Sequence, residues 1–200
     1  MIGIINYEAG NIRSVSNALR TIGVDFLVSA DPKELDRCQG IILPGVGAAP
    51  GAMASLDRSG ITTYLKKVKK PLLGICLGMQ LLYERSEEGD TSCLGVIPGE
   101  VKKLSSDAVK IPHIGWNMVT TENGCSLLNE IGGGKYFYFA HSYYAPPDNR
   151  TQGTTECGVR FASVIAQDNF FGIQFHPEKS GAVGLQLLKN FDTLCKSYRR

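Results

Sequence analysis

One cysteine of this chain stands between glycines where an apolar run gives way to a helical pattern. Cys76 is the centre of Gly74-Ile75-Cys76-Leu77-Gly78 and follows the apolar residues 71–75. A strand-to-helix turn of this kind presents a nucleophile above a sheet, and nearby glycines allow the tight, strained backbone. We predict that Cys76 is a nucleophile. The alternative is a small buried cysteine in a structural turn.

A histidine and a glutamate near the carboxyl end could serve that thiol. They form the motif His176-Pro177-Glu178. Proline favours an extended conformation at the residue before it, and residues two apart in an extended segment share a face. Glu178 is then expected beside the imidazole, holding its tautomer while His176 relays protons. This motif alone could be an incidental strand end, but together with Cys76 it favours a Cys-His-Glu triad.

Two backbone N–H groups are candidates for binding an oxyanion. The first belongs to Leu77, the residue after the predicted nucleophile. The second belongs to Val46 in Pro44-Gly45-Val46-Gly47, where glycines let the backbone approach a ligand. A dinucleotide-binding motif fits poorly here, because Pro50 occupies the place of the third glycine.

The residues that usually bind metals are scattered along the chain. The only histidines are His113, His141 and His176, none of them in an HExxH motif, and the six cysteines form no CxxC pair. Such a distribution rarely builds a zinc site, so we predict neither a metal nor a cofactor.

The composition is that of an ordinary soluble globule. The chain has 200 residues, 43% of them hydrophobic and 20% charged, with a net charge of +2. We predict one domain over residues 1–200, without a disulfide framework. The basic residues 66–70 are expected to form a solvated helix face rather than a nucleic-acid site. The first expected strand follows Met1 directly, and no apolar run would span a membrane, so we expect a cytoplasmic protein.

Short apolar runs alternate with helical patterns through the first half of the chain. Strands are expected at residues 2–7, 24–28, 41–43 and 71–75, and helices at 12–22 (capped by Asn11), 31–37 and 77–85, with a helical stretch over much of 51–68. The second half is richer in strands, at residues 101–104, 114–120, 136–141, 161–167 and 171–175, before a helix at 181–196. The pattern predicts an α/β fold: an open, mostly parallel sheet with helices on both faces and added antiparallel strands.

Six segments carry a resemblance to a known family. Residues 74–80 and 172–180 contain the triad motifs, and through them the chain resembles the class I, or triad, glutamine amidotransferases. Within that family it is similar to the glutaminase subunits of imidazole glycerol phosphate synthase, through residues 10–15, 44–48, 113–117 and 136–143.

The resemblance implies a substrate and a partner. Cys76 would form a glutamyl thioester, which water hydrolyses after ammonia leaves. The residues implied in glutamine binding are Gly45, Gly47, Gln80, His141, Ser142 and Tyr143. The implied partner is a cyclase subunit, a (β/α)8 barrel that receives the ammonia in a heterodimer.

Five residues outside the catalytic roles are expected to face that partner: Asn11, Arg13, Trp116, Tyr138 and Lys179. Core packing is the alternative for Trp116 and Tyr138, because both lie in apolar runs. Glu8 and Ala49 depart from the family's usual residues, and both are expected near the docking surface.

Three other functions compete with this interpretation. A related amidotransferase subunit could keep all of these motifs while feeding ammonia to a different synthase. A cysteine hydrolase on the same sheet would act without a partner, and high activity of the isolated chain would favour it. A non-catalytic module would have no need of an intact triad.

Overall fold

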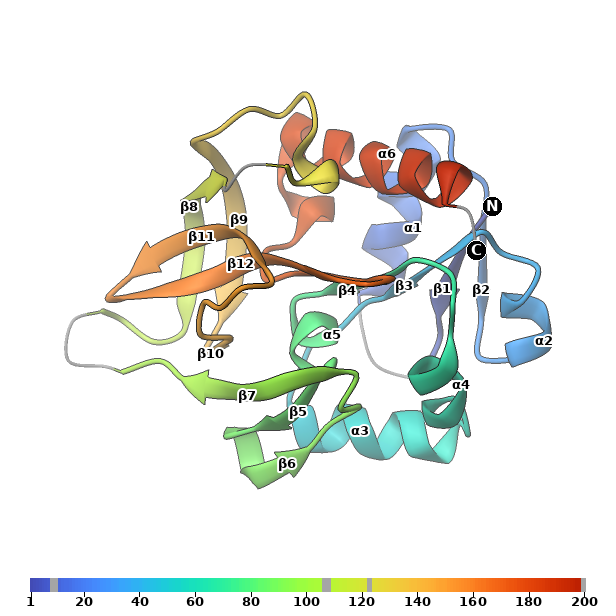
Figure 1. The fold of residues 1–200 in the computed structure, drawn as a ribbon, viewed down its shortest axis with the longest axis horizontal. Helices are drawn as coiled ribbons and strands as arrows, with labels where there is room; N and C mark the ends of the chain where they lie inside the picture. Colours follow the sequence, from blue (N-terminus) through green and yellow to red (C-terminus); the bar gives the residue numbers. More distant parts are fainter. Residues whose placement is uncertain (8–10, 106–108, 122–123, 199–200) are drawn as a thin grey trace.

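A nine-stranded sheet forms the centre of the molecule (Figure 1). The computed structural model describes residues 1–7, 11–105, 109–121 and 124–198. Five neighbouring strands run parallel, and their sheet order is β2 (Phe26–Ser29), β1 (Ile2–Ile5), β3 (Gly40–Leu43), β4 (Leu72–Ile75) and β13 (Phe170–Ile173). Four antiparallel strands extend the sheet beyond β13, in the order β12 (Val159–Gln167), β11 (Thr151–Cys157), β8 (His113–Thr121) and β9 (Lys135–His141).

Helices cover both faces of this sheet, so the predicted fold class is confirmed (Figure 1). The helices α1 (Ile12–Thr21) and α6 (Gly181–Ser197) lie on one face, and α3 (Ala49–Arg58), α4 (Thr62–Lys67) and α5 (Leu77–Gln80) lie on the other. The short α2 (Pro32–Leu35) flanks the edge at β2. None of the helices in the described part of the chain is long and apolar enough to cross a membrane.

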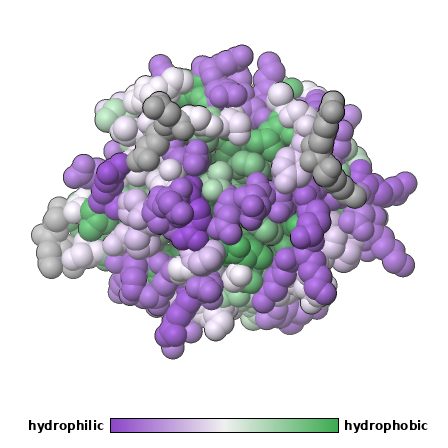
Figure 2. Space-filling view, viewed as in Figure 1, coloured by the Kyte–Doolittle hydropathy of each residue, from purple (hydrophilic) through white to green (hydrophobic). Residues whose placement is uncertain are grey.

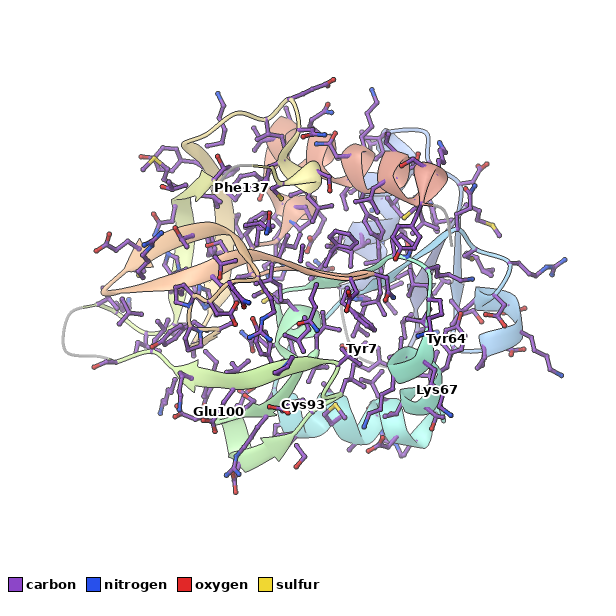
Figure 3. All side chains as sticks on the ribbon, viewed as in Figure 1. Tyr7, Tyr64, Lys67, Cys93, Glu100 and Phe137 are labelled. Carbon is purple, nitrogen blue, oxygen red and sulfur yellow. The ribbon has the colours of Figure 1, made fainter. Side chains whose placement is uncertain are left out.

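Two apolar clusters lie between these layers. In Figure 3, Phe137 of β9 packs on the side of α6, whereas Tyr7 lies on the opposite side of the sheet. Polar side chains cover most of the face shown in Figure 2, and apolar residues lie recessed between them. The buried side of α6 is formed by Leu187, Leu188, Phe191 and Cys195. It is rotated from the predicted stripe, since Leu185 and Leu194 are only half-buried.

A second, smaller sheet was not predicted. It has the order β10 (Tyr143–Tyr144), β7 (Ile97–Lys103), β5 (Tyr83–Ser86) and β6 (Thr91–Ser92). The helix predicted over residues 77–85 is wrong beyond its first turn, because Tyr83–Ser86 pairs with β7 and β6. This long-range pairing outweighs the local helical preference. The strand β11, rich in threonine, also lacked an apolar pattern that would have revealed it.

The basic run at residues 66–70 does not form a uniformly solvated face. Lys70 is 5% exposed, and its Nζ donates hydrogen bonds to the carbonyls of Leu35, Asp36 and Cys38 at 2.8–2.9 Å. A buried ammonium is stable only when its donors are satisfied, and these three carbonyls lie at the end of α2 or just after it. Lys70 therefore ties the end of α2 to the start of β4.

Backbone-to-backbone packing joins the ends of β3 and β4 to α5. A Cβ atom at Gly78 would overlap the carbonyl oxygen of Leu43, and a Cβ atom at Gly74 would lie 2.6 Å from the Gly78 carbonyl oxygen. A Cβ atom at Gly45 would overlap the backbone nitrogen of Gly78. These glycines are needed because no side chain fits between the three elements.

This packing predicts that even a methyl side chain at Gly78 greatly lowers the free energy of unfolding. Gly78→Ala should lower the free energy of unfolding by about 3 kcal/mol, because the added methyl group forces the β3 backbone away. Gly51→Ala is the matched control, since Gly51 lies exposed in α3 and a methyl group added there would meet no atom within 4 Å. The control should gain up to about 1 kcal/mol. Urea unfolding of both variants checks this, and equal stability would contradict it.

Candidate active site

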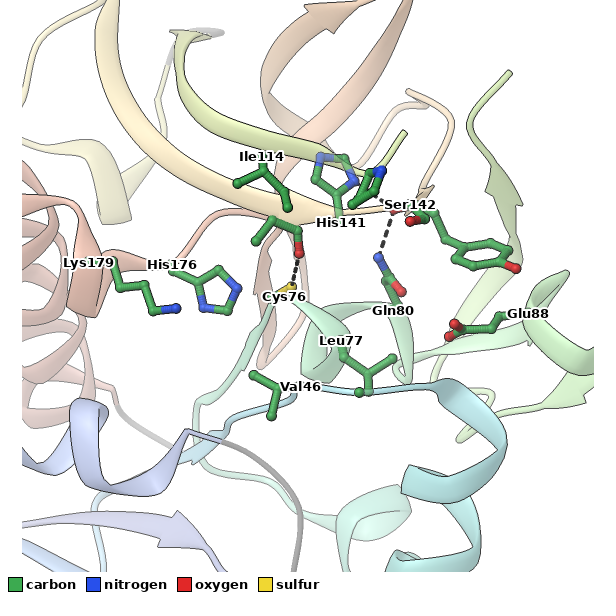
Figure 4. A pocket seen from close by; sticks show the side chains of 14 residues that line it. Val46, Cys76, Leu77, Gln80, Glu88, Ile114, His141, Ser142, His176 and Lys179 are labelled. Atoms are coloured by element: carbon green, nitrogen blue, oxygen red, sulfur yellow. Dashed lines mark hydrogen bonds between the residues drawn. The ribbon is translucent and has the colours of Figure 1, made fainter. Parts of the chain in front are cut away.

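A cavity of about 290 Å³ opens where the parallel strands β3, β4 and β13 end (Figure 4). The carboxyl ends of parallel strands are the usual place for a site in such sheets. The lining residues include the predicted Val46, Gly47, Cys76, Leu77, Gln80, His141, Ser142, Tyr143, His176 and Lys179, together with Glu88, Pro112, Ile114 and Ala140. Segments far apart in the sequence thus meet around one thiol.

Cys76 sits in a strained backbone conformation between β4 and α5. Its φ is 53° and its ψ −111°, values that L-residues adopt only when their surroundings enforce them. Its N–H donates to the Ile173 carbonyl at 2.8 Å, which joins the turn to β13. The thiol lies 3.7 Å from the Ala140 carbonyl oxygen and 3.7 Å from Nε2 of Gln174. The predicted sharp turn is therefore present, with the sulfur directed toward the cavity.

His176 and Glu178 pack beside this thiol. Nδ1 of His176 lies 2.8 Å from Oε1 of Glu178, and both side chains are almost fully buried. His176 is extended, as predicted, but Glu178 reaches it from a 3-10 turn, Pro177–Lys179. Burial by itself disfavours the imidazolium, but hydrogen bonds and charge interactions with Cys76 and Glu178 outweigh it and raise the pKa of His176 to about 10. The three side chains form one interacting group, in which His176 and Glu178 are hydrogen-bonded.

Asn11 joins this group instead of capping α1. Its Nδ2 donates to Oε1 of Glu178 at 3.2 Å, and its side chain makes no capping hydrogen bond to the helix. Oε1 of Glu178 therefore receives hydrogen bonds from both Asn11 and His176. The helix begins after Asn11 as predicted, but the expectation that Asn11 only faces a partner overlooked this contact, because no local pattern links residues so far apart.

The residues implied in substrate binding do not all lie at the cavity in the same way. Gln80 is 3% exposed, and its Nε2 donates to the Tyr143 carbonyl at 2.8 Å and to Oε1 of Gln174 at 3.0 Å. Gly47 lines the cavity with φ +93°. Gly45 is packed against Leu77 and Gly78 and is not among the residues that line the cavity.

Two polar residues of the site were missed from the sequence. Gln174 is fully buried between Cys76 and Gln80, and the signal was available, because it stands two residues before His176 and shares its face. Glu88 lines the cavity, and its Oε2 accepts a hydrogen bond from the Ala49 N–H at 2.7 Å. No local motif distinguishes Glu88.

Of the residues expected to face a partner, Lys179 lines the cavity. Trp116 is 55% exposed, so core packing does not account for it, and Tyr138 is half-buried with its ring centroid 6.2 Å from that of Trp116. Nζ of Lys179 lies 5.6 Å from the centroid of the Tyr138 ring, and Arg13 is exposed. Ala49 is fully buried, so it does not form part of a docking surface, and Glu8 lies outside the described residues.

The His176–Glu178 contact predicts how the imidazole titrates. In Glu178→Gln the pKa of His176 should fall from about 10 toward the ordinary value, because the variant loses the negative charge while burial still disfavours the imidazolium. NMR titration of the histidine ring protons measures this, with His113 and His141 as internal references. An unchanged pKa of His176 would show that Glu178 does not stabilise the imidazolium.

Known proteins resemble this chain over its whole length. The family model described as "Glutamine amidotransferase class-I" matches residues 3–193. A relative from Bacillus cereus (strain ATCC 14579), "Imidazole glycerol phosphate synthase subunit HisH", is 50% identical over 204 residues, covering 100% of this chain and 97% of the relative. A protein of the same name from Bacillus cytotoxicus is 48% identical with the same coverage.

Solved structures share the fold at lower identity. One described as a glutamine amidotransferase has a TM-score of 0.76 at 18% identity and covers 98% of each chain. PurLQS from Thermotoga maritima has a TM-score of 0.73 at 22% identity, covering 96% of this chain and 97% of that one. The family model over residues 3–193 and the curated relatives at 48–50% identity show the family: the chain belongs to the class-I glutamine amidotransferases.

Proposed function

We propose that this chain is the glutaminase subunit of an imidazole glycerol phosphate synthase, hydrolysing glutamine to glutamate and ammonia. The observation that carries the proposal is the buried contact of Cys76, His176 and Glu178 at the cavity. The identity of 50% to a protein named as a subunit of that synthase supports the choice of pathway, histidine biosynthesis. Residues 1–200 would act as one amidotransferase domain, in the cytoplasm and without a metal or cofactor.

The reaction begins with the thiol of Cys76. With a pKa raised to about 10, His176 holds the proton of the Cys–His pair near pH 7, and the sulfur attacks the carboxamide carbon of glutamine. The same imidazolium then donates a proton to the leaving nitrogen, so that ammonia departs and a glutamyl thioester remains. Water, deprotonated by His176, attacks the thioester and releases glutamate and the thiol. Glu178 holds Nδ1 of the imidazole throughout, which directs Nε2 toward the sulfur.

The cavity offers groups that suit glutamine. The Leu77 and Val46 N–H groups would bind the oxyanion, and both residues line the cavity. Glu88 places a carboxylate at the same cavity, suited to the α-ammonium group of the substrate. Gly47, Gln80, His141, Ser142 and Tyr143 would complete the binding site, with Gly45 acting through the packing of the loop.

The ammonia would pass to a cyclase subunit, a (β/α)8 barrel, in a heterodimer. The barrel would join it to a phosphoribulosyl-formimino aminoimidazole carboxamide ribotide, forming imidazole glycerol phosphate and an aminoimidazole carboxamide ribotide. The outward face of β8 and β9 supports a partner at this place, because Ile114, Trp116, Met118 and Tyr136 are all exposed there. Ile114 also lines the cavity, so a subunit covering this face would reach its mouth. Asn11, Arg13, Tyr138 and Lys179 would belong to the same interface.

Replacement of the thiol tests the function. In the assembled synthase, Cys76→Ala should abolish glutamine-dependent synthesis, because the nucleophile is gone, while synthesis from added ammonia continues. Cys93→Ala is a matched control, since Cys93 is buried among apolar residues and does not line the cavity. Formation of imidazole glycerol phosphate from each nitrogen source measures both. Glutamine-dependent synthesis that survives in Cys76→Ala would disprove the assignment.

The oxyanion loop predicts that the partner stimulates hydrolysis. The Tyr7 hydroxyl donates to the Pro44 carbonyl at 2.7 Å, and Gly45 is held against Gly78. The peptide between Gly45 and Val46 is therefore the first peptide after β3 that is free to rotate. Val46, being β-branched, restricts that rotation. The isolated chain should therefore be slower than the ligand-bound complex by about 10²–10³-fold, the usual cost of one missing oxyanion donor.

Val46→Gly should raise the basal rate of the isolated chain, because glycine removes that restriction. Steady-state ammonia release, measured with and without the cyclase and its ribotide ligand, compares the parent with the variant. A fully active isolated parent would rule out this role of the loop.

A further inference from the structure

We propose that His113 and His141 are positioning residues that hold the cavity wall at Ser142 and Tyr143. They form a hydrogen-bonded pair within a series of hydrogen bonds that leads from Asn117 to the Tyr143 carbonyl. In each of these bonds the donor lies on the Asn117 side and the acceptor on the Tyr143 side. The inference rests on the proposed function, since this wall belongs to the cavity assigned to glutamine. It gives His141 a role through the backbone of Tyr143 rather than through a ring nitrogen on the substrate.

The two histidines face each other across neighbouring strands. His113 of β8 is in register with His141 of β9, and their side chains are buried on the inner face of the sheet. The rings of Phe139 and Phe161 pack against both of them, at centroid distances between 5.0 and 6.1 Å. An imidazole in such surroundings is stable only if its polar atoms find partners.

The hydrogen bond nearest the cavity determines the tautomer of His141. Nδ1 of His141 lies 2.8 Å from the Tyr143 carbonyl oxygen, which can only accept, so Nδ1 carries the hydrogen. Burial lowers the pKa of His141 to about 4, so the ring is neutral near pH 7 and its Nε2 is an acceptor. Nδ1 of His113 lies 3.0 Å from this Nε2 and must therefore donate to it.

The hydrogen bonds of Asn117, at the opposite end of the series, determine the tautomer of His113. Oδ1 of Asn117 accepts from the Met118 N–H at 2.8 Å, while its Nδ2 donates to the Glu156 carbonyl at 3.0 Å. Exchanging the positions of Oδ1 and Nδ2 would break both hydrogen bonds, so the orientation of the amide is fixed. The same Nδ2 lies 3.3 Å from Nε2 of His113, which must accept. Burial also lowers the pKa of His113, in agreement with a neutral ring. Both histidines are then Nδ1–H tautomers.

The direction of these bonds has a consequence at the cavity. The Tyr143 carbonyl receives a second hydrogen bond from Nε2 of Gln80, which also contacts Gln174 beside Cys76. The neighbouring Ser142 carbonyl accepts from the Leu104 N–H at 2.9 Å. Three groups thus hold the wall by hydrogen bonds: Leu104 next to the small sheet, Gln80 of α5, and the histidine pair. Both nitrogens of His141 are occupied in this arrangement, which leaves neither for glutamine.

The first test observes the tautomers directly. Long-range proton–nitrogen NMR spectra of the full-length chain, labelled with nitrogen-15 at histidine, should show protonated Nδ1 and unprotonated Nε2 for both His113 and His141 at pH 7.5. An Nε2–H tautomer or an imidazolium at either position would overturn the proposal. This result does not depend on turnover or on the stability of a variant.

The second test separates hydrogen bonding from packing in the assembled synthase. His113→Phe keeps an aromatic ring against Phe139 and Phe161 but removes the donor to His141. It should raise the KM for glutamine about tenfold, the effect of one lost buried hydrogen bond, with kcat little changed. His113→Asn loses the ring but keeps an N–H near the position of Nδ1, so it should restore a KM close to that of the parent.

A purely structural role predicts the reverse order. Phenylalanine would then be better tolerated than asparagine, both in KM and in thermal unfolding, which is measured alongside. A parental KM in His113→Phe, or a KM in His113→Asn above that of His113→Phe, would overturn the inference. If the parent synthase did not hydrolyse glutamine, the proposed function would fail instead, while the tautomer spectra would still decide the arrangement of the pair.

Discussion

The close approach of three backbone segments is the constraint on which the site depends. Gly74, Gly78 and Gly45 leave no space for side chains where β4, α5 and the end of β3 meet. Only this proximity places the Cys76 turn directly beside the loop that carries Val46. The strained φ of Cys76 is supported by the same contacts and by its hydrogen bond to β13, the strand that leads to His176. The proposed nucleophile, its proposed base and the proposed oxyanion loop are thus held by one packed junction.

Around this junction, several buried polar side chains pair with one another or with backbone carbonyls, although Oε2 of Glu178 has no hydrogen-bond partner among the described residues. Gln80, Gln174 and the Tyr143 carbonyl form one such group, and Asn11, Glu178 and His176 form another. An unpaired polar group in these positions would cost about 1–3 kcal/mol, so each group specifies a single arrangement. Lys70 serves the same purpose far from the cavity, where it ties α2 to the start of β4. Satisfaction of buried polar atoms therefore orders both the scaffold and the site.

The pair β8 and β9 shows how one structural element can serve two surfaces. Its inner face carries Phe137, Phe139 and the two histidines, while its outer face exposes Trp116 and its apolar neighbours. Alternation along a strand separates these faces by a single residue, so the proposed docking face and the cavity wall share one backbone. This arrangement would let a partner bound to the outer face change the geometry of the cavity.

The sequence by itself determined the α/β class and most of the strands of the large sheet, and it singled out Cys76, His176 and Glu178 as the proposed triad. These signals are local: apolar runs, glycines around a turn, and a proline between two candidate side chains. The sequence misled where pairing is long-range. Tyr83–Ser86 continues a helical pattern yet forms a strand against β7, and β11 carries no apolar alternation although it pairs with a strand on each side. Asn11 and Glu178, or His113 and His141, meet only because strands and helices far apart in sequence are packed together. The tertiary structure alone decided these contacts, because the partner of a buried polar atom is chosen by the packing of whole elements and not by the residues next to it in the chain.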